Sequence, residues 1–276
     1  MVNEYVPESA TSGASSTRPI SAQLAPVLEQ LELDDVRFVT AERLATLLQE
    51  AQVRTPVRKV AHRLRQRGWL LPTHTQGVWE FAPAALAGRH SRTGPTRDLQ
   101  AALARRSIEC GLTFQAAAWA MGLADRVPLR LEVAAATRQD AELLPERLNV
   151  SVFAAHLPAQ TAKGVPVLQP ASVIVHMCAG PGRVRSWSSA QEWLPDLAAE
   201  CDLDGVIAEV TGRPATVQAR TGYLLQAMRP DIVAHLSPAK TKTWFGPRAP
   251  LVRNDERWLI ADTILPFDPR TLGSVG

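Results

Sequence analysis

Basic side chains are concentrated in one short part of the sequence. Residues 51–97 contain nine Lys and Arg residues and a single acidic residue, Glu80, whereas residues 98–276 contain equal numbers of basic and acidic residues. Such a local excess of positive charge is typical of a surface that binds a polyanion, although it is also found on helix faces that are merely solvated. DNA is the polyanion that the spacing of these residues favours.

The spacing of residues 56–66 predicts a helix suited to the DNA major groove. Val57, Val60, Ala61 and Leu64 fall on one side of a helical wheel. Lys59, His62 and Gln66 would then lie opposite this apolar stripe. A helix of this length measures about 16 Å and can enter a groove about 12 Å wide. Lysine to guanine and glutamine to adenine are established base contacts, whereas arginine beside them reaches phosphates.

We therefore predict a DNA contact formed by the turn before this helix, the polar face of the helix and the hairpin turn after it. The predicted residues are Arg54, Thr55, Arg58, Lys59, His62, Arg63, Gln66, Arg67, Thr73, His74, Thr75 and Gln76. His62 is equally compatible with a neutral surface histidine, and the hairpin turn with a simple polar turn.

The elements around this helix predict a winged helix-turn-helix. Apolar spacing indicates a first helix over Leu24–Leu31, a short strand over Val36–Val39 and a second helix that begins after Thr40 as N-cap. Thr55 and Pro56 would start the third helix and Gly68 would end it. Residues 69–81 then read as strand, turn and strand. This order of elements is that of a winged helix.

The remainder of the chain predicts a second domain of mixed α+β class with a mostly helical C-terminal part. We expect a disordered lead at 1–19, the winged-helix domain at 20–83, a linker at 84–97 and the second domain at 98–276. The predicted helices of the second domain cover 99–110, 114–121, 171–178, 188–201, 202–210 and 215–228, and its predicted strands cover 129–133, 150–154 and 164–168.

Signals for catalysis, metal binding and export are weak. The hydrolase elbow, phosphate-loop, dinucleotide and zincin motifs do not occur, so we expect no enzymatic activity and no cofactor or metal. The acidic residues near Asp202 suit a helix start better than a metal site. Three cysteines without a CxxC pair, and a lead without an apolar stretch, favour a reducing cytoplasm.

Several short motifs resemble AbiEi-type antitoxins. In the first domain they are Thr40-Ala41-Glu42, Arg67-Gly68-Trp69-Leu70 and the segment 77–83, in which Trp79 stands where the family usually has tyrosine. In the second domain the similar segments are 115–123, the strands near 129 and 150, 164–167 with Pro170, and 220–225. The resemblance covers about residues 34–228, and the chain after Met228 matches no family motif. Trp244 and Trp258 in that tail indicate an additional packed element.

The resemblance implies a type IV toxin–antitoxin pair. The antitoxin would repress its own promoter by binding repeated half-sites in the DNA. It would oppose a nucleotidyltransferase-like toxin without requiring a tight complex with it. Two other interpretations remain open: a nucleic-acid-processing enzyme with a metal-dependent site in the second domain, and a winged helix used for protein contacts.

Overall fold

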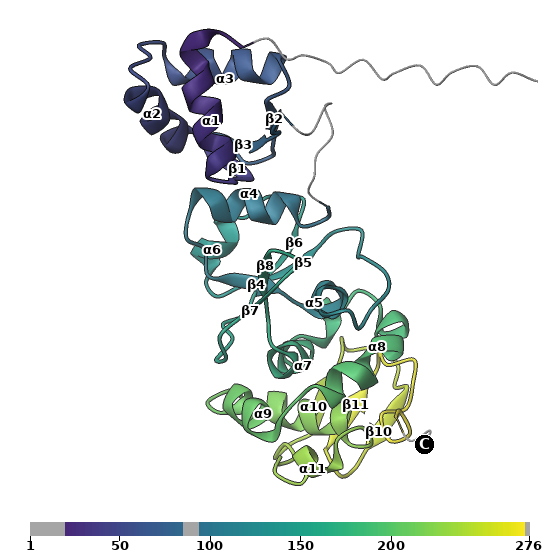
Figure 1. Cartoon of the computed structure of the whole chain (residues 1–276). Helices are drawn as coiled ribbons and strands as arrows, with labels where there is room; N and C mark the ends of the chain where they lie inside the picture. Colours follow the sequence, from purple (N-terminus) through teal and green to yellow (C-terminus); the bar gives the residue numbers. More distant parts are fainter. Residues whose placement is uncertain (1–19, 85–93, 274–276) are drawn as a thin grey trace, which may run out of the picture. The chain divides into compact units, whose positions relative to one another are not determined.

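The computed structural model of the chain describes residues 20–84 and 94–273 (Figure 1). The predicted disordered lead at 1–19 and most of the predicted linker lie outside the described residues. The chain divides into two compact units, residues 1–94 and 95–276. The division falls within the segment predicted as a linker, and each unit is described by itself.

The first unit contains three α-helices and a small sheet in the predicted order. A 3-10 turn, η1 (Ala22–Leu24), leads into α1 (Ala25–Leu33), which is followed by β1 (Phe38–Thr40) and α2 (Ala41–Glu50). The third helix, α3 (Val57–Gln66), is followed by the hairpin of β2 (Leu70–Pro72) and β3 (Val78–Phe81). β3 is antiparallel to both neighbours, giving the strand order β1-β3-β2.

Local sequence signals fix the ends of these helices. The Thr40 hydroxyl accepts a hydrogen bond from the Arg43 N–H at 3.2 Å, which confirms the predicted N-cap of α2. α3 ends before Gly68, whose φ of +75° favours glycine. The start of α3 differs from our prediction. Thr55 makes no capping hydrogen bond; instead the Pro56 carbonyl accepts from the N–H groups of Lys59 and Val60.

One apolar core joins the helices of the first unit to its sheet. Val60, Ala61 and Leu64 are buried in this core, as the helical spacing predicted, and Val57 is half-buried. They pack in the same cluster as the buried faces of α1 and α2 and as Phe81 of β3. Because the apolar stripe of α3 is used in this way, the polar side of the helix is left in solvent.

The second unit is built on a five-stranded mixed sheet with the order β6-β5-β4-β8-β7. Its strands are β4 (Cys110–Leu112), β5 (Glu132–Ala135), β6 (Asn149–Val152), β7 (Gln160–Ala162) and β8 (Val165–Val167). In Figure 1, α4 (Arg97–Arg105) and α6 (Arg138–Leu143) lie toward one side of the sheet, and α5 (Phe114–Met121) and α7 (Pro170–Ala179) toward the other.

Helices and a small second sheet complete this unit. After the short turn η2 (Pro181–Arg183) come α8 (Trp187–Ala199), α9 (Leu203–Val210), α10 (Ala215–Leu225) and α11 (Pro230–Val233). The sheet has the order β10-β11-β9, formed by β9 (Thr243–Phe245), β10 (Arg253–Asp255) and β11 (Ile260–Asp262). The α+β class and the helical C-terminal part are therefore confirmed.

The predicted packed element near Trp244 and Trp258 corresponds to this second sheet and the loops beside it. Trp258 is 1% exposed and lies directly over Gly222 of α10. A Cβ atom at position 222 would approach the indole to 2.2 Å, so only glycine permits this contact. The tail is thus packed against α10 through a glycine that no local turn requires.

Two predictions in the second unit were wrong in detail, and one strand was not predicted. The helix expected at 99–110 ends at Arg105, and Cys110 begins β4 instead, because β4 pairs with β5 and β8 far away in the sequence. The strand expected at 129–133 begins at Glu132, and Leu129 is 95% exposed. The edge strand β7 was not predicted, since its residues are largely polar and small.

Candidate nucleic-acid interface

Helix α3 presents its cations to solvent without partners. Arg58, Lys59, His62, Arg63, Arg65 and Gln66 are all exposed. No ion pair or hydrogen bond of the Arg58, Lys59, Arg63 or Arg65 side chains is found among the described residues. A surface of uncompensated cations on one helix is favourable for an external anion and unfavourable for the isolated protein.

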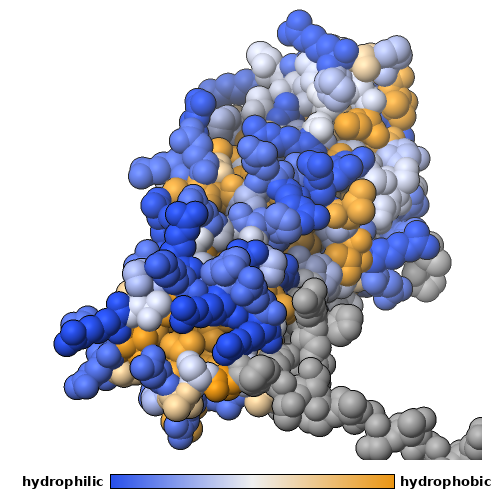
Figure 2. Space-filling model, turned by 90° about the horizontal axis from the view of Figure 1, so that it is seen from above, coloured by the Kyte–Doolittle hydropathy of each residue, from blue (hydrophilic) through white to orange (hydrophobic). Residues whose placement is uncertain are grey.

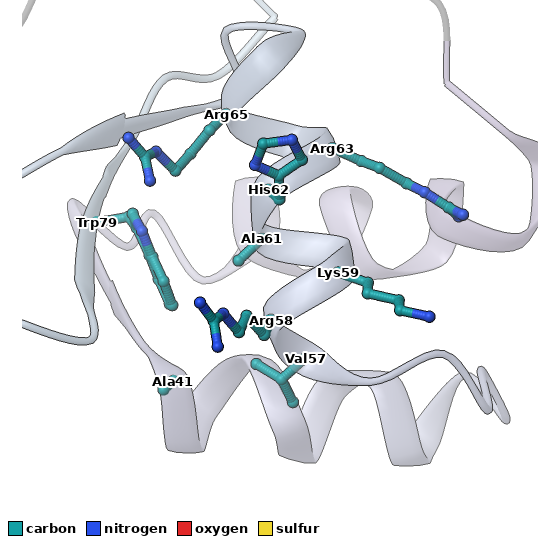
Figure 3. Close-up of a pocket in the computed structure, with 9 residues that line it drawn as sticks. All are labelled: Ala41, Val57, Arg58, Lys59, Ala61, His62, Arg63, Arg65 and Trp79. Carbon is teal, nitrogen blue, oxygen red and sulfur yellow. The ribbon is translucent and has the colours of Figure 1, made fainter.

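The close-up of this helix shows how its side chains diverge (Figure 3). Arg58 and Arg65 point toward Trp79 of β3, whereas Lys59 and Arg63 extend to the opposite side of the helix. His62 lies between the two groups. The sequence interpretation placed Lys59, His62 and Gln66 at the centre of the polar face, and this arrangement is compatible with it.

A hollow of about 880 Å³ lies between α3 and the sheet of the same unit. Its apolar lining comes from Ala41, Val57, Ala61 and Trp79, and its basic lining from residues of α3. The indole of Trp79 is half-buried and so remains partly available to a ligand. The hollow therefore combines an aromatic wall with cations at its rim.

The residues that flank α3 are placed differently from one another. Arg54 and Arg67 are exposed at the two ends of the helix, and Thr55 is half-buried. In the hairpin turn the Thr73 hydroxyl donates to the Val78 carbonyl at 2.7 Å and accepts from the Thr75 N–H at 3.2 Å. This hydroxyl stabilises the turn itself. His74 and Gln76 are exposed at the tip of the turn.

Sequence reasoning missed Arg65 and gave Trp79 only a packing role. The signal for Arg65 was present, because Arg58, His62 and Arg65 have the i, i+4, i+7 spacing of one helix face. The signal for Trp79 was absent, because only the folded hairpin brings β3 beside α3. Both residues belong to the surface that lines the hollow.

Three polar clusters of the second unit are bonded within the fold. Glu209 of α9 is fully buried and accepts hydrogen bonds from the Ser172 hydroxyl at 2.6 Å and from the His156 and Leu157 N–H groups. Its other oxygen lies 2.7 Å from Arg213. Burial opposes ionisation, but these hydrogen bonds hold the pKa of Glu209 below its ordinary value.

His176 of α7 is likewise part of a closed cluster. Its ring stacks on Phe153 with centroids 4.2 Å apart, and its two nitrogens contact the hydroxyls of Thr113 and Ser151. Burial, followed by the charges of Arg183 and Arg213, lowers the pKa of His176 to about 3. The ring is neutral near pH 7 and serves packing and hydrogen bonding.

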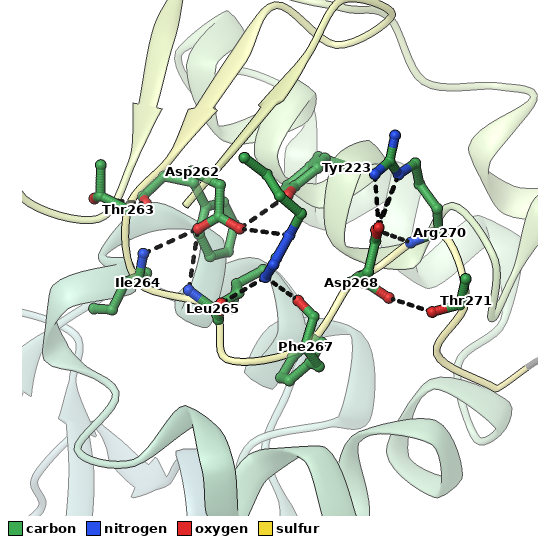
Figure 4. Close-up of polar contacts among 11 residues, drawn as sticks. Tyr223, Asp262, Thr263, Ile264, Leu265, Phe267, Asp268, Arg270 and Thr271 are labelled. Atoms are coloured by element: carbon green, nitrogen blue, oxygen red, sulfur yellow. Dashed lines mark hydrogen bonds and ion pairs between the residues drawn. The ribbon is translucent and has the colours of Figure 1, made fainter. Parts of the chain in front are cut away.

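The C-terminal sheet is held by a third paired cluster (Figure 4). The Tyr223 hydroxyl donates to the buried Asp262 carboxylate at 3.0 Å, and the N–H groups of Ile264 and Leu265 donate to its other oxygen. Arg253 lies 3.4 Å from the same carboxylate. Burial, followed by the Asp262 charge, raises the pKa of Tyr223.

The acidic residues considered as a metal site are used in other ways. The Asp202 carboxylate accepts a hydrogen bond from the Gly205 N–H and caps α9, as predicted. Within the described ranges, no three His, Cys, Asp or Glu side chains lie close enough to hold a metal ion. In the same part of the chain, no helix has both the length and the apolar character needed to span a bilayer.

Comparison with known proteins finds a family similar to part of the second unit. Residues 109–227 match the AbiEi antitoxin C-terminal domain. The crystal structure of the RV2827C protein from Mycobacterium tuberculosis is similar with a TM-score of 0.74 and 24% identity, covering 93% of this chain and 96% of that one. This similarity establishes a shared fold. Curated proteins give no match. Residues 109–227 are therefore similar to the C-terminal domain of AbiEi antitoxins, the family that the sequence motifs indicated.

Proposed function

We propose that this chain is an antitoxin and a DNA-binding autorepressor, and that α3 reads its promoter. Lys59, His62 and Gln66 would contact base edges, and Arg58 and Arg63 the phosphates beside them. The remaining predicted contacts would come from the ends of α3 and from the hairpin turn. Repeated half-sites in the promoter would each take one copy of this unit.

The observation that carries this proposal is the absence of internal partners for the α3 cations. Residues 54–67 contain Arg54, Arg58, Lys59, Arg63, Arg65 and Arg67 and no acidic residue. Arginines and lysines that stabilise a fold pair with carboxylates or carbonyls; these side chains pair with neither in the described part of the chain. Their charge is available for phosphates.

A mobility-shift titration of the full chain tests DNA binding. The DNA is the chain's own promoter, and a random duplex of equal length is the competitor. We expect a retarded complex whose half-saturation lies at lower protein concentration for the promoter. Arg58→Ala with Arg63→Ala should weaken both complexes, whereas Arg138→Ala, which removes one exposed arginine of the second unit, should weaken neither. No retardation of either duplex would contradict the proposal.

We further propose that the second domain opposes a nucleotidyltransferase-like toxin in a type IV pair. The AbiEi match at residues 109–227 supports an assignment of antitoxin activity to this part of the chain. In co-expression with the toxin, the Arg58→Ala, Arg63→Ala variant should still restore growth, because α3 is needed for DNA alone. Loss of protection at equal protein levels would contradict this division.

The two units are proposed to be independent domains joined near residues 84–97. The division of the chain between residues 94 and 95 supports this. Limited proteolysis between Arg89 and Arg97 should release a fragment from the N-terminal side that unfolds cooperatively by itself. A fragment without a cooperative transition would count against the boundary. A cytoplasmic, non-enzymatic protein without cofactors is the corresponding inference for the whole chain.

A further inference from the structure

The hollow between α3 and Trp79 has the features of a second DNA contact. Lys59 and His62, which are proposed to read bases, line part of the hollow, whereas Arg58, Arg65 and Trp79 lie to one side of Lys59 (Figure 3). Arg58 and Arg65 both point into this region, and neither has a partner among the described residues. The rest of its lining consists of three small or branched apolar side chains, the Trp79 indole, and Lys59, His62 and Arg63 of α3.

The dimensions of a helix in the major groove indicate what would enter this hollow. An α-helix with its side chains is about 10–12 Å across, and the groove is about 12 Å wide. A helix that fills the groove therefore has a sugar–phosphate backbone beside each flank. Arg63 extends from one flank of α3, and Arg58 and Arg65 extend from the other flank toward Trp79 of β3.

The chemistry of the second flank matches a DNA backbone better than a base. Arg58 and Arg65 are seven residues apart, which corresponds to about 10 Å along the helix. They are therefore suited to separate phosphates, and the apolar lining between them to the sugar that links the phosphates. An exposed aromatic face packs against a deoxyribose without distinguishing among bases.

We propose that this hollow binds the sugar–phosphate backbone of one DNA strand, with Trp79 packed on the sugar and Arg58 and Arg65 on the phosphates. The proposal rests on the proposed DNA-binding function. It assigns Trp79 and Arg65 a positioning role: they hold the duplex in place while Lys59 and Gln66 read it. Their effect on affinity is therefore independent of DNA sequence.

Three substitutions in the full chain test the subsite. Arg65→Ala should lower affinity for promoter and random duplex by the same factor and make the slope of log K against log salt shallower by roughly 1. Trp79→Ala should also lower the affinities for promoter and random duplex by the same factor, of several-fold or more. It should leave the slope of log K against log salt unchanged. Trp79→Tyr should restore most of the affinity, because it keeps an aromatic face.

A charge placed inside the hollow gives the third test. Ala41 lines the hollow and is the first residue of α2, where an acidic side chain suits the helix dipole. Ala41→Glu should therefore keep the fold and repel the phosphate, weakening both complexes. The matched control is Ala215→Glu, at the exposed first residue of α10, which should bind DNA as the unsubstituted chain does.

The outcomes separate this subsite from the proposed function. If the unsubstituted chain binds no DNA, both fail. If it binds DNA, and Arg65→Ala, Ala41→Glu and a folded Trp79→Ala all bind with unchanged affinity, the subsite alone is wrong. If Trp79→Ala changes the ratio of promoter to random affinity, the ring contacts a base, and the backbone assignment is overturned. Thermal unfolding of each variant verifies that it is folded.

Discussion

The arginines of α3 and the arginines in the core of the second unit have opposite roles. In the first unit, Arg58, Arg63 and Arg65 extend from α3 into solvent and have no partner among the described residues. In the second unit, four arginines are bonded inside the fold: Arg213 to Glu209, Arg220 to the Trp244 carbonyl, Arg229 to the Ala198 carbonyl and Arg253 to Asp262.

This difference separates cations that stabilise the fold from cations that are free to bind. A buried arginine is held by fixed acceptors, so its removal leaves those acceptors unpaired. Removal of an exposed arginine of α3 leaves no acceptor of the fold unpaired. It affects only the binding of an external anion. The surface in Figure 2 is largely hydrophilic, so exposure of charge alone does not mark a site. The more informative property is that residues 54–67 gather six Lys and Arg residues with no acidic residue among them.

The largest effect is expected when a buried arginine is removed. Arg213→Ala would leave the fully buried Glu209 carboxylate without its cation. The hydrogen bond from Arg213 Nη2 to the Ala154 carbonyl at 2.7 Å would be lost as well. Breaking a buried pair in this way costs about 3–5 kcal/mol of the free energy of unfolding. Arg63→Ala should cost no more than about 0.5 kcal/mol. Urea denaturation of the two variants compares them, and equal losses would erase the distinction between the units.

A smaller loss is expected for the hydroxyl of Tyr223. Tyr223→Phe removes the hydrogen bond to the Asp262 carboxylate but keeps the ring in place against Phe245. Hydrogen bonds to charged groups contribute about 1.5–3 kcal/mol. The free energy of unfolding should fall by that amount, measured by urea denaturation. An unchanged value would mean that Arg253 and the backbone N–H groups satisfy Asp262 by themselves.

The buried Glu132 predicts a pH effect confined to the second unit. Burial raises its pKa to about 7, against the opposing hydrogen bonds of the Ala116 and Gln115 N–H groups and the charge of Arg185. The folded state therefore holds a proton that the unfolded state releases near the ordinary glutamate pKa of 4.5. The contribution of Glu132 to stability is complete below that value and is lost as pH rises to about 7.

The matched variant for this effect is Glu132→Gln, which cannot titrate. His176, with its pKa lowered to about 3, contributes a slope of opposite sign below its unfolded value of 6.5. The quantity to compare is therefore the difference in stability between the original chain and the Glu132→Gln variant at each pH. Between pH 5 and pH 7, the original chain should lose stability relative to the variant, as followed by thermal unfolding. A constant difference across this range would contradict a raised pKa at Glu132.

The smallest effect concerns a single exposed charge of the first unit. Arg63→Ala should leave stability nearly unchanged but remove one proposed phosphate contact on the flank of α3 opposite Trp79. The slope of log K against log salt should become shallower by roughly 1, for promoter and random duplex alike. Titrations at several salt concentrations measure this. An unchanged slope would place Arg63 outside the contact.

Local chemistry explains which parts of the fold were predictable from the sequence. The Thr40 cap, the Gly68 end of α3 and the buried stripe of Val60, Ala61 and Leu64 depend on residues within one or two helical turns. The strand at Cys110 was predicted as helix because its hydrogen-bond partners lie on β5 and β8, far along the chain.

The same limit applies to the candidate site, where the exposed face of α3 was predictable but contacts between separate elements were not. Lys59, His62 and Gln66 were placed on the exposed face because helical spacing determines that face. The hollow could not be foreseen, since it requires β3 to bring Trp79 beside α3. The internal use of the Thr73 hydroxyl could not be foreseen either, because its acceptor, the Val78 carbonyl, lies across the turn.

The reading of promoter DNA by the polar face of α3 is the central claim, and the affinity ratio tests it most directly. The ratio compares promoter with random duplex for the unsubstituted chain, Lys59→Ala and Gln66→Ala. Loss of a base contact should weaken promoter binding by about 1–3 kcal/mol and leave random binding nearly unchanged, so that the ratio falls. If both variants keep the original ratio, α3 does not read the sequence, and the hairpin turn around His74 becomes the better candidate.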